Sequence, residues 1–252
     1  MLFGGDRIKS DYKSDYWRNF WSGKRDAGHR SHSESYLYNE ACERLYHLEG
    51  GDSILDVGCG TCDLLAYYAL HYSTVVGADF APSMLEGARQ RLDEFHIAHV
   101  ELIEADDESI WNKLSPGSTF DRITAGMVVQ NLTLERVGSF IENAKARLNE
   151  GGKIVLFDIM EPKNLALWEA GLWKDDEVPW ARVSRYLIMA YLGRKLNMLR
   201  GLPERRVLGF AYTPKQISDI AKRCSLSAAY ANAMYYEYRY HAILTRNADN
   251  GT

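Results

Sequence analysis

The chain has 252 residues, of which 46% are hydrophobic and 25% charged, and its formal net charge at pH 7 is −4. This composition is typical of a globular protein with one large domain, and the acidic balance argues against a nucleic-acid partner, which normally requires a strongly basic surface. The amino end lacks the apolar stretch of a signal peptide and no run approaches the length of a membrane span, so we expect a cytoplasmic protein, as a monomer or homodimer.

Residues 1–49 are predicted to form a helical cap. Aromatic side chains at positions 16, 17, 20 and 21 fall on one face of a helix. Such a face either pads the domain or closes over a ligand pocket. His29, His32 and Tyr36 follow in the same region, the two histidines as candidate general bases and the tyrosine as a candidate substrate contact.

Residues 54–65 read ILDVGCGTCDLL, which predicts an apolar strand ending near Asp56 and a tight turn through Gly58, Cys59 and Gly60. Glycines after a strand let the backbone approach a ligand closely, and the N–H groups of a following helix favour negative or polar ligand atoms. A dinucleotide-binding fingerprint would place a third glycine three positions after Gly60, where this chain has Asp63. The turn is therefore predicted to bind a different ligand.

Four more strands are expected at 74–80, at 100–106, within a strand and turn at 120–132, and after a turn at residues 151 and 152 up to residue 159. Helices at 62–72, 82–95 and 134–149 separate them. Alternation of this kind gives a parallel sheet with helices on both faces and ligands at the carboxyl ends of the strands. Asp79 closes the second strand about twenty residues after the glycines, where a carboxylate can accept both hydroxyls of a ribose. Asp106 and Asp107 close the third, and Asp158 stands near the end of the fifth.

In this order the motifs resemble those of class I S-adenosylmethionine (SAM) methyltransferases, over roughly residues 50–160, and residues 120–132 (FDRITAGMVVQNL) most resemble the ubiquinone/menaquinone C-methyltransferase type. The resemblance implies SAM as methyl donor, with S-adenosylhomocysteine (SAH) as product. It also implies a Rossmann-like seven-stranded sheet in the order 3-2-1-4-5-7-6, with the last strand antiparallel. The implied cofactor contacts are Asp56, Gly58, Cys59, Gly60, Asp79, Phe80, Met84, Asp106, Asp107 and Met127.

Cys62 departs from the family pattern, because the family usually carries glycine at this position. A small side chain then occupies the closest approach to the methionine part of the cofactor, and modest backbone adjustment is expected to suffice. Cys59 and Cys62 also spell C-x-x-C, but no second cysteine pair exists, so we expect no metal site.

Residues 161–212 are predicted to form a helical lid insertion that is rich in arginine after position 180. Arg182 and Arg185 could contact an anionic substrate; a solvated helix face and a weak membrane contact are the alternatives. Residues 213–246 should add a helix and an antiparallel hairpin (strands 227–234 and 236–244) to the same domain, and 247–252 a polar tail. Tyr235 and Tyr236 are predicted to line the substrate pocket, whereas His241 is predicted to be structural.

The sequence therefore predicts a SAM-dependent methyltransferase acting on a small molecule, with oxygen as the favoured acceptor atom and an anionic acceptor possible. His29, His32 and Asp158 are the candidate bases. Three alternatives stay open: a methyltransferase of RNA or protein, a non-catalytic SAM-binding module, and a dinucleotide-dependent oxidoreductase.

Overall fold

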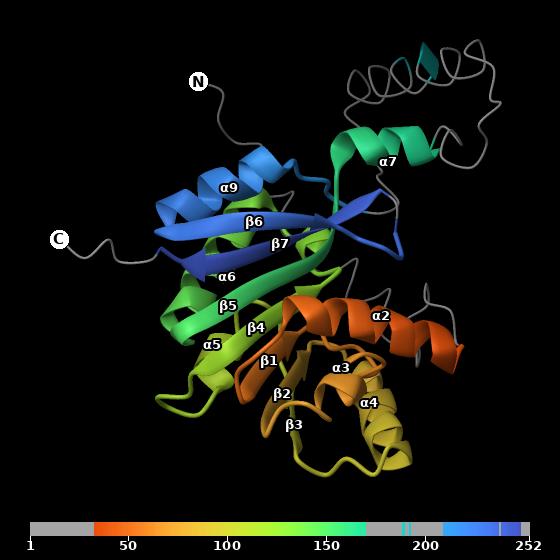
Figure 1. Ribbon diagram of the computed structural model, residues 1–252, viewed down its shortest axis with the longest axis vertical. Coiled ribbons are helices and arrows are strands. Elements are labelled where there is room, and N and C mark those ends of the chain that lie inside the picture. Colours follow the sequence, from red (N-terminus) through yellow and green to blue (C-terminus); the bar gives the residue numbers. More distant parts are fainter. Residues whose placement is uncertain (1–32, 170–187, 190–191, 193–208, 237, 248–252) are drawn as a thin grey trace, which may run out of the picture.

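The computed structural model describes residues 33–169, 188–189, 192, 209–236 and 238–247. One seven-stranded sheet forms its centre, in the order β3-β2-β1-β4-β5-β7-β6 (Figure 1). The strands are β1 (Ser53–Val57), β2 (Thr74–Asp79), β3 (Val100–Glu104), β4 (Phe120–Gly126), β5 (Leu148–Met160), β6 (Leu226–Asn232) and β7 (Arg239–Arg246). The helices are α2 (Glu34–His47), α3 (Leu65–Tyr68), α4 (Pro82–Glu94), α5 (Ile110–Lys113), the 3₁₀ turn η1 (Val129–Asn131), α6 (Leu134–Ala146), α7 (Pro162–Glu169) and α9 (Pro214–Arg223).

The predicted strand order and polarity are confirmed. The strands from β1 to β5 pair in parallel, whereas β7 runs antiparallel to both β5 and β6. The carboxyl ends of β1 to β5 therefore lie at one edge of the sheet, which we call the carboxyl edge. In the described part of the chain, no helix is both long and apolar enough to cross a membrane.

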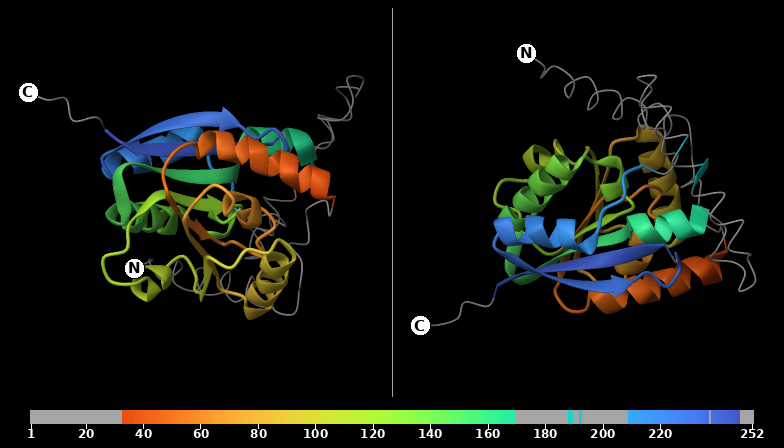
Figure 2. Two further views of the ribbon diagram at one scale, coloured as in Figure 1. Left: turned by 60° about the horizontal axis from the view of Figure 1, so that its bottom comes forward. Right: turned by 90° about the horizontal axis from the view of Figure 1, so that it is seen from above.

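Helices cover both faces of the sheet because successive strand residues point to opposite sides. Ile54 packs in a cluster with α2, α3 and α4, and its neighbour Leu55 packs in a second cluster with α5, α6 and α9. The three layers are visible when the molecule is turned (Figure 2).

α2 is fixed to the sheet at the end opposite the carboxyl edge. Arg122, on β4, is buried and donates to the backbone carbonyls of Leu48 and Glu49, which follow the helix. Tyr72 donates to the Leu48 carbonyl as well. These bonds satisfy carbonyl groups that a helix end leaves without partners, so α2 is held in place over β4 and β5.

Several predicted boundaries were wrong, among them those of two helices and of the last strand. The helix expected over 62–72 is only α3, because Cys62 adopts a left-handed backbone (φ 59°) and delays its start. The helix expected to reach 149 ends at Ala146, because Leu148 already pairs with Phe120 on β4. The last strand begins at Arg239, three residues later than expected, which leaves the predicted pocket residues 235 and 236 in the connection after β6.

We expect Thr213→Ala to lower the free energy of unfolding by about 1 kcal/mol, because Thr213 and Gln216 form a reciprocal capping box at the start of α9. Ser33→Ala is the matched control, since Ser33 precedes α2 without a side-chain capping bond. Urea unfolding of the two variants measures the difference. Equal losses would show that the capping box contributes nothing.

Candidate functional site

The glycine turn is fastened to the end of β2 at the carboxyl edge. The backbone N–H groups of Gly58 and Cys59 both donate to the Ala78 carbonyl, at 2.7 and 2.9 Å. The N–H of Gly60 donates to the Asp79 side chain at 3.0 Å. Gly58 (φ 79°) and Gly60 (φ 56°) have left-handed backbones that favour glycine. Hydrogen bonds to the end of β2, including the Asp79 side chain, therefore hold the glycine turn in place.

Asp79 is a buried carboxylate, 7% exposed. One oxygen accepts from the N–H of Ala81 at 2.9 Å and the other from Gly60. Burial raises its pKa to about 6, and the backbone hydrogen bonds only partly oppose that rise. An ionised carboxylate offers about four lone-pair sites, so each oxygen can still accept a further hydrogen bond. Two hydroxyl donors, such as those of a ribose, fit this capacity.

The two turn glycines face different surroundings. A Cβ atom on Gly58 would overlap the Val128 side chain, whereas one on Gly60 would meet no atom within 4 Å. Gly60 therefore borders open space beside the Asp79 carboxylate. That is where the sequence predicts the cofactor, and the residues present are compatible with it.

Cys62 has a left-handed backbone, a conformation that favours glycine. Its φ is 59° and its side chain is fully buried. A left-handed non-glycine residue costs about 1 kcal/mol or more. Contact with Cys62, together with burial, raises the pKa of the Cys59 thiol well above its ordinary value.

The two acids after β3 have local partners. Asp106 accepts from the N–H of Ser109 at 2.8 Å and from its hydroxyl at 2.6 Å. Asp107 forms an ion pair with Arg136 on α6 at 2.5 Å. These contacts hold the loop after β3, and a direct role toward the cofactor stays a prediction for both acids. Glu104, which the sequence analysis did not single out, is exposed and lies beside Asp79 in the strand register; its place as the last residue of β3 was the available signal.

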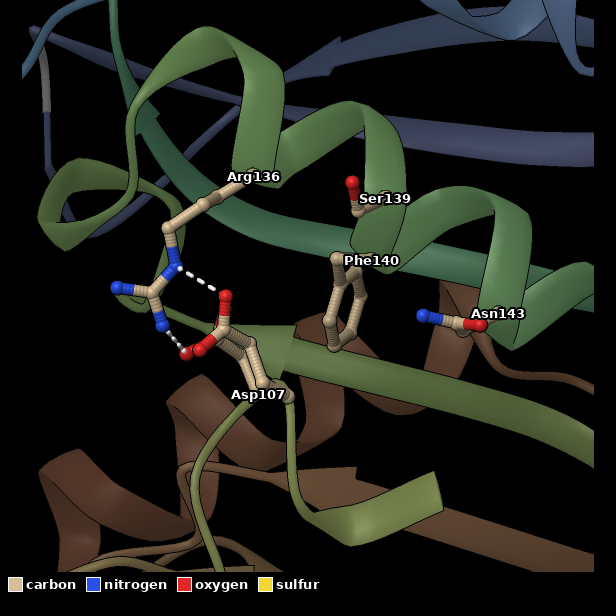
Figure 3. Close-up of a pocket in the computed structure, with 6 residues that line it drawn as sticks. Asp107, Arg136, Ser139, Phe140 and Asn143 are labelled. Atoms are coloured by element: carbon tan, nitrogen blue, oxygen red, sulfur yellow. Dashed lines mark hydrogen bonds and ion pairs between the residues drawn. The ribbon is translucent and has the colours of Figure 1, made fainter. Parts of the chain in front are cut away.

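A cavity of about 200 Å³ lies between this loop and α6 (Figure 3). It is smaller than ordinary ligand pockets, which occupy roughly 300–1,000 Å³. Burial raises the pKa of Asp107 to about 6, against the attraction of Arg136. The lining is Asp107, Glu108, Arg136, Ser139, Phe140 and Asn143. It contains none of the glycine turn, so we do not assign the cofactor to it.

Phe80 follows Asp79 directly, and Met84 comes five residues after Asp79 at the same edge. Phe80 is half-buried and Met84 is buried in the first turn of α4. Met127, after β4, has a left-handed backbone (φ 57°), and its N–H donates to the Phe157 carbonyl on β5. Asp56 is buried within β1 and accepts a 2.7 Å hydrogen bond from the Thr124 hydroxyl.

A buried ion-pair network stands next to the end of β4. The Arg44 guanidinium donates to Glu40 at 2.6 Å and to Asp158, and it lies 4.9 Å from the centre of the Phe157 ring. A Cβ atom on Gly126 would be only 2.8 Å from this guanidinium. Burial opposes the charge of Arg44, but the nearby carboxylate of Asp158 raises its pKa. Asp158, one of the predicted bases, is therefore engaged as a counter-ion.

His241 completes the network from β7. It is fully buried, its Nδ1 accepts from the N–H of Asp158 at 3.1 Å, and its Nε2 lies 2.8 Å from Glu43 Oε1. Because Nδ1 is the acceptor, the ring proton is on Nε2 and the ring is neutral. Glu43, His47 and His241 are close enough to hold a metal ion, but this tautomer leaves Nε2 of His241 without a free lone pair. The contacts are those of a structural residue.

Two predicted substrate contacts lie together. Tyr36 on α2 and Tyr235 in the connection after β6 meet edge to face, with ring centres 5.1 Å apart. Tyr236 lies against the Arg239 guanidinium, 5.6 Å from its ring centre. His29, His32, Arg182 and Arg185 lie outside the described residues.

Residues 55–154 match a family model described as a methyltransferase domain. The strand order of the sheet and the motifs at its carboxyl edge agree with that match. Over these residues the chain is similar to a methyltransferase domain.

The curated relatives that this chain resembles are named for different acceptors. The ubiquinone/menaquinone biosynthesis C-methyltransferase UbiE of Teredinibacter turnerae is 32% identical over 138 residues, which is 53% of each chain. A tRNA (guanine(10)-N2)-dimethyltransferase of Methanothermobacter thermautotrophicus is 34% identical over 119 residues, 44% of this chain and 34% of that protein. The chain thus spans from a third to about half of the length of these relatives.

A solved structure shows the same fold over nearly the whole chain. Magnesium protoporphyrin IX methyltransferase from Synechocystis PCC 6803, with bound SAH, has a TM-score of 0.57 at 18% identity, over 95% of this chain and 98% of that one. At this identity the likeness shows the fold alone and identifies no acceptor.

We expect Gly60→Ala to weaken SAM binding at least tenfold while the protein stays folded, because the added methyl enters the open space beside Asp79. Gly151→Ala is the matched control, since Gly151 also has a left-handed backbone (φ 70°) and no atom within 4 Å of an added Cβ. Both variants bear similar backbone strain, so calorimetric SAM titration isolates the effect of position. Equal affinities would place the cofactor elsewhere.

Proposed function

We propose that this protein transfers the methyl group of SAM to a small-molecule acceptor. The buried Asp79 carboxylate, tied to the glycine turn and bordering the open side of Gly60, is the observation that supports SAM binding most directly. The whole activity is our proposal, because the curated relatives match only part of their own length.

The chain's own residues would bind and orient the reactants. SAM supplies a methyl group that its sulfonium charge has already activated. Asp79 would hold the ribose, Phe80 and Met84 would flank the adenine, and the turn at Gly126 and Met127 would border the methyl group. Holding an acceptor in line with that methyl group can contribute several of the roughly 7–11 kcal/mol available from proximity.

A small acceptor is favoured over RNA for two reasons. The net charge of −4 is opposite to the basic surface that a polyanion requires. The tRNA-modifying relative shares only about a third of its own length with this chain.

Oxygen is our proposed acceptor atom. A hydroxyl acceptor must lose a proton, and a positioned base typically accelerates such a step by about 10²–10⁴. Asp158 is near the end of β4, but its carboxylate is available to a proton only if Arg44 releases it. His29 and His32 remain the other proposed bases.

We also propose that the acceptor carries an anionic group, because Arg182 and Arg185 belong to an arginine-rich stretch of an acidic protein. The double variant Arg182→Ala/Arg185→Ala should raise the acceptor KM about tenfold or more and leave SAM affinity within twofold. Steady-state kinetics with acceptors found among phosphorylated and carboxylated metabolites, each beside its uncharged analogue, would measure this. A preference for neutral acceptors would overturn the proposal.

We expect SAM affinity to fall as the pH drops below about 6, the pKa of Asp79 in the ligand-free protein. Ribose hydroxyls donate to the carboxylate form, so protonation competes with binding. The pKa of Asp79 is raised above its ordinary value of 3.8, so the folded protein binds this proton more tightly than the unfolded chain does. The stabilisation that the bound proton gives to the folded state is therefore present below pH 3.8 and is lost as the pH rises through about 6.

Asp79→Ala should weaken SAM by about ten- to a hundredfold at pH 7.5 and remove the pH dependence. Asp107, whose pKa is also raised to about 6, is retained in that variant and serves as the internal control. Calorimetry from pH 5 to pH 8 measures both effects. An unchanged affinity in the folded variant would refute the role of Asp79.

A further inference from the structure

Glu40 is a buried carboxylate that the ion-pair network uses only in part. It is 1% exposed, and its Oε1 accepts a 2.6 Å hydrogen bond from Arg44. Its Oε2 is buried and has no hydrogen-bond partner among the residues that the structure describes. An unsatisfied buried carboxylate oxygen costs free energy and is rare in folded proteins, so it points to a partner that arrives from outside the chain.

The charges around Glu40 do not balance. Arg44 serves both Glu40 and Asp158, and Arg239 donates to the backbone carbonyl of Asp158. Glu43 adds a third carboxylate opposite the neutral ring of His241. Arg44 pairs with two of these carboxylates and Arg239 binds a carbonyl, so even with both guanidinium charges counted the three carboxylates leave these described residues with one negative charge in excess. A cation at Glu40 would neutralise it.

α2 runs toward the amino ends of the strands, so its first turns lie at the carboxyl edge. Near its start, Tyr36 contacts Tyr235 in the connection that leads to β7, which pairs with the end of β5. After its end, the Leu48 carbonyl accepts from Arg122, near the start of β4. The same direction is visible in Figure 1.

Glu40 is therefore placed at or just beyond the end of β4. The Arg44 guanidinium lies against Gly126, the last residue of that strand, and the Glu40 carboxylate is 2.6 Å from the same guanidinium. Helical side chains tilt toward the helix amino end, which here is the carboxyl edge. The unpartnered oxygen thus belongs to the side of the molecule where the reactants are proposed to bind.

We propose that Glu40 Oε2 binds the ammonium group of a ligand held at the end of β4. An ammonium group supplies both the donor that the oxygen lacks and the positive charge that the cluster lacks, whereas a hydroxyl supplies only the donor. The proposal rests on the proposed function, since it places Glu40 beside the reacting groups. Two ligands offer this chemistry: the methionine part of SAM and an amine-bearing acceptor.

The test compares Glu40→Gln with Glu34→Gln. Glutamine keeps an oxygen for Arg44 but removes the charge, and Glu34, on the same helix, is an exposed acid paired with Arg91. Calorimetry compares the affinity for SAH with the affinity for its analogue that lacks the α-amino group. Thermal shift in the presence of SAH compares the stabilisation given by three amines with that given by their amine-free counterparts. The pairs are tyramine and 4-ethylphenol, glucosamine and glucose, and ethanolamine and ethanol. If Glu40→Gln does not fold, Glu40→Asp withdraws the carboxylate by one methylene and keeps its charge.

If the cofactor supplies the ammonium group, wild type should prefer SAH over the deaminated analogue, and Glu40→Gln should reduce that preference about ten- to a hundredfold. If the acceptor supplies it, SAH affinity should stay constant and the stabilisation by amine probes should disappear. Glu34→Gln should change neither. A folded Glu40 variant that keeps both preferences, or a wild type with neither, would overturn the proposal. A wild type that does not bind SAH would instead overturn the proposed function.

Discussion

The hydrogen bond from Gly60 to Asp79 joins the two segments on which the rest of the carboxyl edge depends. Asp79 terminates β2, and the glycine turn follows β1, its parallel neighbour. The turn follows a left-handed path at both glycines, and burial raises the pKa of the Asp79 carboxyl although the hydrogen bond from Gly60 opposes that rise. The bond therefore joins the turn to a desolvated acceptor beside open space.

A second constraint comes from α2, which brings charges into the core. Breaking a buried pair by removing one partner typically costs about 3–5 kcal/mol, because the remaining charge stays buried. Arg44, Glu40 and Asp158 therefore depend on one another, and they connect the helix before the glycine turn to the strand that follows β4. Arg122 fixes the other end of α2. The helix can thus present Glu40 and Tyr36 at the carboxyl edge with little freedom to move.

The sequence predicted the strand order and the glycine turn because these features are local or follow from general topology. Strand, glycine and acid recur at fixed spacing, and alternation of strands with helices limits the possible sheets. The left-handed backbone of Cys62 was not predicted, since a small buried thiol gives no sign of its φ. The late start of β7 was also missed, because Tyr235 and Tyr236 are strand-forming residues that tertiary contacts hold in a connection.

The ion-pair network was not predicted for a different reason. Glu40 and Arg44 are four residues apart in a polar helix, and this spacing is typical of an exposed pair. Only the docking of α2 on β4 and β5 shows that both are buried, and only the contact with Asp158, 114 residues away, shows that Arg44 is shared. Local sequence motifs therefore predicted the glycine turn and the acids at the carboxyl edge. The contacts of Arg44 with Glu40 and Asp158 arise only where α2 meets a strand that is distant in the sequence.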